Sequence, residues 1–195
     1  DVAAGWAGLQ VAHATVHPAF WIYFAGAFVC GVAAWAKFRW MPHLGVLACA
    51  AALAATLTLD APAPVALLFL VMIGFIAFIV SVYSLGYMAH AHRQGWYWFF
   101  LLLTFASLAG IVSTPDMAAM YGYWELMTFA SYFLVVHEAN RVAFDAGFKY
   151  YLMCAGGALL MLPGMLLLGN GGLGLADVRI QSALLSPHVL NMAAL

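Results

Sequence analysis

The stretch from Val65 to Met88 contains no charged side chain. About 20 apolar residues suffice for a helix to cross roughly 30 Å of hydrocarbon, so this stretch is long enough to span a bilayer. The whole chain is 67% hydrophobic and 7% charged, whereas soluble domains carry roughly a quarter charged residues. These features predict an all-α integral membrane protein.

Five further apolar stretches resemble this one in length. The predicted spans are residues 18–36, 43–59, 65–88, 95–113, 117–136 and 146–168. Residues 1–17 form a lead-in, residues 18–94 hold the first three spans, and residues 95–168 hold the next three. Residues 169–195 are interpreted as a loop, a short interfacial helix and the approach to a further helix.

Positive charges predict the orientation. They follow the odd-numbered spans, at Lys37, Arg39, Arg93 and Arg141. The even-numbered connections carry Asp60 and Asp116, with Arg179 as their one positive charge. Counting Lys and Arg in short loops places the odd-numbered connections in the cytoplasm, so both ends face outward. The chain starts at Asp1 without a methionine, and we expect it to be a piece of a longer polypeptide.

Charge and cysteine content exclude several functions. A formal net charge of −1 gives no electrostatic basis for binding nucleic acid. The three cysteines lie in apolar runs without CxxC or Cys/His spacing, so no metal or cluster site is expected. We therefore predict no cofactor in this chain.

Glu125 lies near the middle of the fifth predicted span, roughly 14 Å from its start. An ionised carboxylate in hydrocarbon costs about 3 kcal/mol or more, so such a residue is usually paired, protonated or functional. Tyr121, Thr128 and Tyr132 recur on the same helical face and would form a polar stripe turned toward protein. Glu125 is either a proton relay group or a structural carboxylate satisfied by these hydroxyls.

Lys149 begins the sixth predicted span, about a turn inside its cytoplasmic end. It is either a functional cation or a lysine whose ammonium extends to the interface. Its depth differs from that of Glu125 by roughly 10 Å, so an interaction between the two charges would need either an intervening water or helix bounds that differ from the predicted ones. His137 and Glu138 follow the fifth span, and His137 is a candidate for proton uptake, with an ordinary interfacial role as the alternative.

Aromatic residues mark two span ends. The sequence YSLGYM, beginning at Tyr83, is interpreted as an aromatic belt with a small-residue helix contact. Trp96, Tyr97 and Trp98 are expected to be interfacial anchors.

Three motifs together resemble a known family. YSLGYM, WELMTFASYFLV around Glu125 and AGFKYYLMCAGGALLML around Lys149 are similar to the antiporter-like subunits of complex I. Related subunits occur in Mrp cation/proton antiporters and in energy-converting nickel–iron hydrogenases and formate hydrogenlyase. SYFLVVHE resembles the hydrogenase branch slightly more. The resemblance covers residues 83–169, and residues outside it match in hydropathy alone.

The resemblance implies a fourteen-helix fold with two inverted five-helix repeats, the first of which would start within residues 95–168. It implies that Glu125 and Lys149 form part of a half-channel for protons or sodium ions. The broken seventh helix, the polar eighth helix and the second repeat of the family have no counterpart here.

The leading hypothesis is a proton-translocating subunit, with sodium as the alternative ion, in the bacterial inner membrane. Glu125 would be its protonatable switch and Lys149 the modulating cation. Iron–sulfur clusters, a nickel–iron site or flavin would belong to partner subunits of an NADH–quinone oxidoreductase or hydrogenase. The competing hypothesis is a structural or assembly subunit that does not transport ions. An unrelated secondary transporter would make the paired motifs a coincidence.

Overall fold

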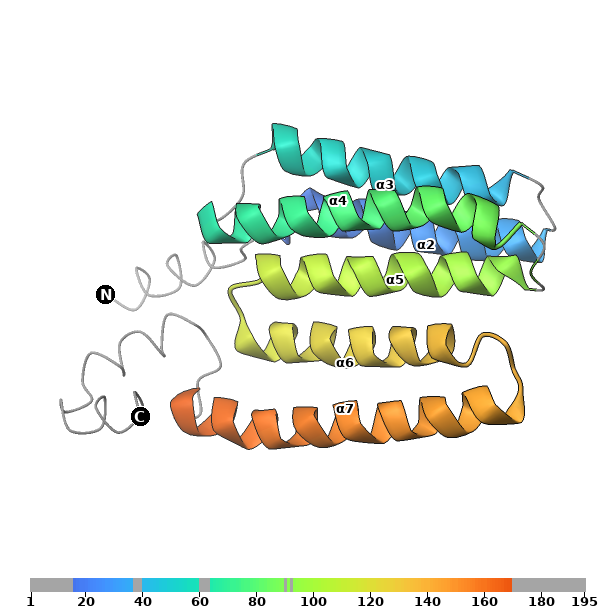
Figure 1. The fold of residues 1–195 in the computed structure, drawn as a ribbon. Coiled ribbons are helices and arrows are strands. Elements are labelled where there is room, and N and C mark those ends of the chain that lie inside the picture. The colour runs from blue at the N-terminus through green and yellow to red at the C-terminus, as the bar shows by residue number, and fades with distance from the viewer. Residues whose placement is uncertain (1–15, 37–39, 60–63, 90, 92, 170–195) are drawn as a thin grey trace.

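The computed structural model describes residues 16–36, 40–59, 64–89, 91 and 93–169. These residues form six helices and no strand, which confirms the predicted all-α fold (Figure 1). The helices are α2 (Pro18–Trp35), α3 (Met41–Thr58), α4 (Pro64–Tyr87), α5 (Gln94–Ser113), α6 (Met117–Val135) and α7 (Arg141–Gly169). The predicted lead-in up to residue 15 and the elements predicted for residues 170–195 lie outside the described residues.

Local signals explain where most helices begin. Proline occupies the first turn of α2, α3 and α4, where its missing N–H needs no partner. Five helices begin and end within two residues of the predicted spans. The sixth prediction was wrong at its start, because α7 begins at Arg141 and not near Ala146. Lys149 therefore lies about two turns inside its helix, deeper than the sequence suggested.

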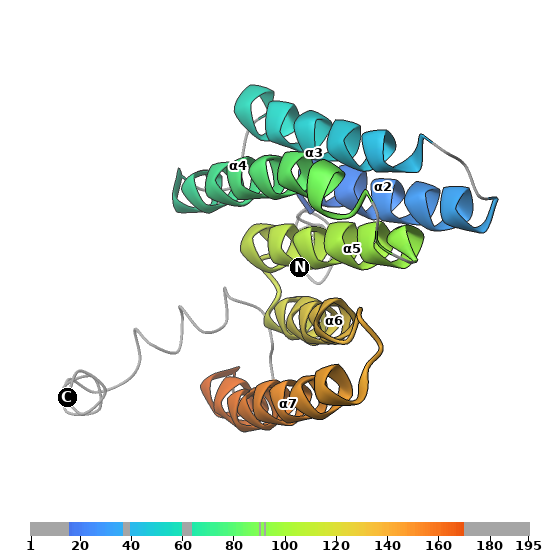
Figure 2. The same cartoon turned by 45° about the vertical axis from the view of Figure 1, so that its right-hand side comes forward.

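The helices pack in an antiparallel bundle with α5 at its centre. α5 contacts α2, α3, α4 and α6, while α7 packs against α6 at the edge (Figures 1 and 2). Trp98 of α5 is fully buried, and its ring lies against Gly45 of α3. The prediction that Trp98 is an interfacial anchor was therefore wrong. Consecutive helical residues point about 100° apart, so a run of three aromatic residues cannot all face lipid.

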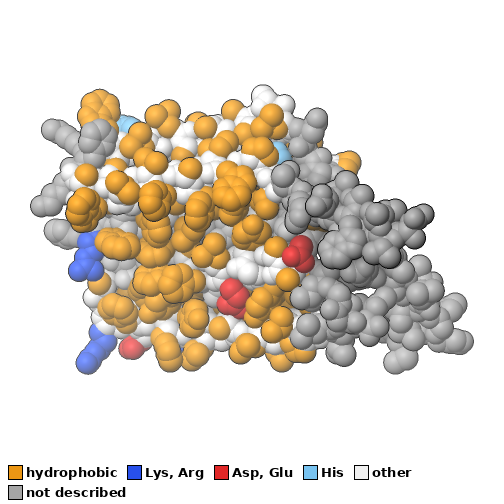
Figure 3. Space-filling view, turned by 180° about the vertical axis from the view of Figure 1, so that it is seen from behind, with side chains coloured by type: hydrophobic (Ala, Val, Ile, Leu, Met, Phe, Trp, Pro, Cys, Tyr) orange, Lys and Arg blue, Asp and Glu red, His pale blue; other side chains and the backbone are white. Residues whose placement is uncertain are grey.

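Four helices, α2 to α5, are long and apolar enough to cross a membrane on their own. α6 and α7 carry the charged residues of the candidate site and are not among these four helices. α6 nevertheless has 19 residues, roughly 28 Å, which matches the hydrocarbon thickness. Figure 3 shows one face of the molecule covered mostly by hydrophobic side chains, with Lys and Arg at one end. That surface suits lipid.

Candidate functional site

Asp116 fixes the start of α6. Its carboxylate accepts hydrogen bonds from the amides of Ala118 and Ala119, at 3.1 and 3.3 Å, as an N-cap does. Glu125 lies eight residues after Met117, roughly 12 Å along the helix axis. Its side chain is partly exposed. Glu125 is thus held near the middle of α6.

Packing determines where the polar stripe of α6 points. Phe133 stacks on Phe100 of α5, with ring centroids 4.3 Å apart. Tyr132, about 100° around the helix, packs against Tyr151 of α7 at 5.7 Å. Glu125 lies two turns before Tyr132 and shares its face. The stripe therefore faces α7, as expected for a stripe turned toward protein.

The neighbours of Glu125 on its own helix carry hydroxyl groups. The Tyr121 side chain interacts with the Glu125 carboxyl one turn away. Thr128, one turn further on, is 1% exposed. Within the part of the chain that the structure describes, no ion pair involves Glu125. Among the described residues, the polar neighbours of Glu125 on α6 are therefore uncharged hydroxyl groups.

One hydrogen bond sets the register between α6 and α7. The hydroxyls of Ser131 and Tyr150 lie 2.8 Å apart, so these residues are at the same level. Since the helices are antiparallel, Gly156 is level with Glu125. Lys149 lies roughly 10 Å from that level, toward the α6–α7 turn. This depth difference agrees with the sequence-based expectation.

Lys149 points away from α6. The α7 residues that contact α6 include Gly147 and Tyr151, each two positions from Lys149. Two positions correspond to about 200° around a helix, and Lys149 is exposed. The structure does not bring the Lys149 ammonium and the Glu125 carboxyl together.

His137 lies in the turn after α6, at the end of the bundle shared with α4 and α5. Its ring meets that of Tyr97 edge-on, with centroids 5.6 Å apart. The Tyr97 hydroxyl is 2.8 Å from Ser84 Oγ, which itself donates to the Val80 carbonyl. Because a serine hydroxyl has one proton, Tyr97 donates to Ser84. Tyr97 was predicted to be an anchor, but it makes a cross-helix hydrogen bond.

Hydroxyl groups lie between His137 and Glu125. The two residues are 12 positions apart, roughly 18 Å along α6 and its turn. Thr128, Ser131 and Tyr132 fall in this interval. Sequence reasoning missed the hydrogen bond between Tyr150 and Ser131, which joins α7 to α6, and the one between Tyr97 and Ser84, which joins α5 to α4. Polar residues inside apolar spans were the available signal for both.

No group of three His, Cys, Asp or Glu side chains among the described residues is arranged to hold a metal ion. Cys30 and Cys49 are buried in the apolar core, and Cys154 is partly buried. The candidate site thus consists of a carboxyl group, hydroxyl groups and a histidine.

Comparisons with known proteins extend this picture. Residues 53–100 match the model of the N-terminal domain of chain 5 of NADH–ubiquinone oxidoreductase, complex I. The Na⁺/H⁺ antiporter subunit A1 of Staphylococcus aureus strains JH9 and Newman is 32% identical over 131 residues, which are 67% of this chain and 15% of that subunit. A chain of the membrane-bound sulfane sulfur reductase, an archaeal respiratory membrane complex, superposes with a TM-score of 0.72 at 16% identity. The match covers 83% of this chain and 39% of that chain.

The bundle therefore has the fold of a chain from a respiratory membrane complex. Over the matched residues, the chain is similar to the antiporter-like subunits of complex I and of Mrp antiporters. It spans about 15% of the length of the curated relatives it matches. The family match begins at residue 53, so the expectation that residues before Tyr83 match in hydropathy alone was wrong. The residues before Tyr83 that match the family contain few polar side chains, so the sequence offers no distinctive motif there.

Proposed function

We propose that this chain acts in an ion-translocating subunit of a complex I-like membrane complex in the bacterial inner membrane. Protons are the proposed ion, with sodium as the alternative. Electron transfer belongs to partner subunits of the NADH–quinone oxidoreductase or nickel–iron hydrogenase type. The observation that carries this proposal is the position of Glu125, midway along α6 and facing α7.

Glu125 suits a protonatable switch for an electrostatic reason. A carboxylate at mid-membrane is costly unless it is paired or protonated, and polar groups at this depth mark ion pathways. The described neighbours of Glu125 include hydroxyls from Tyr121 and Thr128 but no cation. Proton uptake would remove the charge, and proton loss would restore it. The protonated and the ionised form of the Glu125 carboxyl are thus the two states of the proposed switch.

Lys149 modulates the protonation of Glu125 from a distance. At roughly 10–15 Å and an effective dielectric constant of about 20, two unit charges interact by about 1–2 kcal/mol. This energy corresponds to nearly a tenfold change in proton affinity. A rotation of α7 about its axis, or a change in hydration, would alter this electrostatic interaction. Lys149 therefore need not touch Glu125 to affect its proton affinity.

His137 is proposed to take up protons from the cytoplasm. It lies at the positively charged end of the bundle, beside the hydrogen-bonded pair of Tyr97 and Ser84. Proton transfer onward to Glu125 would use the hydroxyls of α6 and intervening water.

Substitution of Glu125 in the assembled complex tests the switch. We expect Glu125→Gln to lower ion translocation into reconstituted vesicles at least tenfold while the complex still assembles, because the amide cannot take up and release a proton. Glu138→Gln is the matched control, since Glu138 is exposed in the turn after α6. Normal coupling between electron transfer and ion movement in Glu125→Gln would refute the proposal.

The orientation of Lys149 supports a second candidate function, that of a structural or assembly subunit. A lysine that faces away from Glu125 could instead hold a neighbouring helix. Lys149→Met separates the two functions. The transport hypothesis expects intact assembly with reduced translocation, whereas the scaffold hypothesis expects loss of subunits with normal translocation in the complexes that remain.

A further inference from the structure

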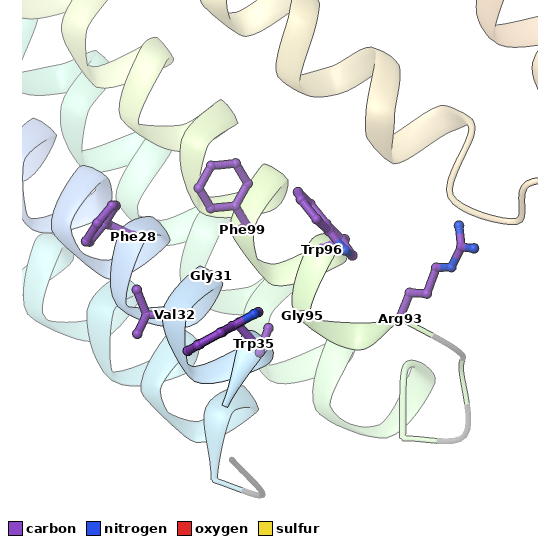
Figure 4. Close-up of a pocket in the computed structure, with 9 residues that line it drawn as sticks. Phe28, Gly31, Val32, Trp35, Arg93, Gly95, Trp96 and Phe99 are labelled. Atoms are coloured by element: carbon purple, nitrogen blue, oxygen red, sulfur yellow. The ribbon is translucent and has the colours of Figure 1, made fainter. Parts of the chain in front are cut away.

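A groove of about 590 Å³ lies between the end of α2 and the start of α5. Aromatic and aliphatic side chains from both helices line it, including Phe28, Val32 and Phe99 (Figure 4). Its volume falls within the range of about 300–1,000 Å³ typical of small-molecule sites. The groove is separate from Glu125, Lys149 and His137, so it forms no part of the proposed ion pathway.

Two glycines shape the groove. Gly95 of α5 lies so close to Ala34 of α2 that a Cβ on Gly95 would overlap that side chain. Gly31 lies one turn along, where a Cβ would come within 3.1 Å of Phe99. The two helix backbones therefore approach each other closely here. The larger side chains beside this contact stand out from both helices and form the walls of the groove.

The groove is apolar along its length and positively charged at one end. Arg93 lies at that end (Figure 4). No acidic side chain within the described part of the chain pairs with its guanidinium group. Trp35 and Trp96 are 88% and 61% exposed beside it. Indole rings at this level are typical of the boundary between headgroups and acyl chains.

We propose that this groove binds an anionic phospholipid of the cytoplasmic leaflet. Arg93 would hold the phosphate, the two indoles would lie at the level of the glycerol backbone, and one acyl chain would pass along Phe28, Val32 and Phe99. The charge pattern favours this ligand, because an apolar groove that ends, among the described residues, at the Arg93 guanidinium complements an amphiphile with a negative headgroup. Arg93 also follows an odd-numbered span, which places it on the cytoplasmic side where anionic lipids gather.

Photoactivatable lipids test this proposal on the intact subunit within its complex. Phosphatidylglycerol with a diazirine in its acyl chain is expected to label residues 28–35 and 93–99, as located by mass spectrometry. The matching phosphatidylcholine probe should label them less. Arg93→Gln is expected to lower phosphatidylglycerol labelling about fivefold, since one arginine near an anionic lipid contributes roughly that factor.

Matched variants distinguish the effect of the Arg93 charge from a general loss of fold, and the effect of filling the groove from a general change in packing. Arg93→Lys should restore most of the labelling, and Arg141→Gln, at the same end of the bundle but outside the groove, should leave it unchanged. Val32→Trp should lower labelling by filling the groove, whereas Val29→Trp, an exposed valine outside the groove, should not. Equal labelling by both lipids, or no effect of Arg93→Gln, would overturn the proposal. Crosslinks from the groove to a neighbouring subunit, without lipid labelling, would overturn it in favour of a protein occupant.

Discussion

Gly45 lets the bulkiest side chain of the core lie against a helix backbone. The Trp98 ring occupies the position that a side chain on Gly45 would need. Trp98 is fully buried, so it has no room to move aside without displacing α2 or α3. Because Gly45 has no side chain, α3 and α5 can pack as closely as they do.

We therefore expect Gly45→Ala to destabilise the protein by about 1–3 kcal/mol, the usual cost of overpacking a core. Thermal unfolding in detergent would measure the effect. Gly86→Ala is the matched control, because nothing lies within 4 Å of a Cβ at Gly86 and alanine favours helix. Equal stability of Gly45→Ala and Gly86→Ala would contradict the packing argument.

His17 is the N-cap residue of α2, and its imidazole ring is neutral in this role. Its Nδ1 accepts a hydrogen bond from the Ala19 amide at 3.2 Å, which a protonated ring could not do. Burial lowers the pKa of His17 below its ordinary value of 6.5. At a pH between the lowered pKa of the folded chain and the ordinary value of 6.5, His17 is therefore protonated more often in the unfolded chain than in the folded one. The stabilising contribution is complete above about pH 6.5 and falls as the pH decreases.

Replacing His17 by asparagine should retain the cap and remove this pH dependence. We expect the loss of thermal stability between pH 8 and pH 5 to be smaller in His17→Asn than in the wild type. His17→Ala should lose about 1 kcal/mol even at pH 8, because no side chain caps the helix. If His17→Asn loses as much thermal stability between pH 8 and pH 5 as the wild type, the pH dependence arises from other histidines.

At the scale of helices, α6 and α7 are joined by a polar contact. Ser131 donates to the Thr128 carbonyl at 3.0 Å, so the Tyr150 hydroxyl must donate to Ser131. The packing of Tyr132 against Tyr151 adds an aromatic contact to the same face. This small set of contacts fixes the register on which the placement of Glu125 and Lys149 depends.

A double-mutant cycle with Ser131→Ala and Tyr150→Phe measures that contact. We expect a coupling energy of about 0.6 kcal/mol, the average for cross-helix hydrogen bonds in membranes. Unfolding of the two single variants and the double variant in detergent gives the value. A coupling energy of zero would show that the helices are held in register by apolar packing alone.

The sequence predicted helix ends better than helix faces. Prolines and charged residues mark the ends of α2 to α6, so these bounds follow from local chemistry. The start of α7 was missed because Asn140 was not recognised as its cap, although its side-chain oxygen accepts from the Ala143 amide at 2.7 Å. The orientation of Lys149 depends on which flank of α7 meets α6. Side-chain packing decides this, and hydropathy does not report it.

At the scale of the molecule, the charge distribution predicts one orientation in the membrane. In a variant without native cysteines, Glu138→Cys should react with a membrane-impermeant maleimide only after the cells are permeabilised. Pro115→Cys, in the turn between α5 and α6, should react in intact cells. Both positions are exposed. The opposite pattern would invert the orientation and place Arg93 and His137 outside.

The length of α7 makes this protein sensitive to bilayer thickness. α7 has 29 residues, roughly 43 Å, whereas α6 has 19, roughly 28 Å. A hydrocarbon layer of about 30 Å accommodates α6 upright, but α7 must tilt or protrude. Lipids with shorter or longer acyl chains would change that tilt, at fractions of a kcal/mol per Å of mismatch. Since α7 carries Lys149 and α6 carries Glu125, the separation of the two charges would vary with membrane composition.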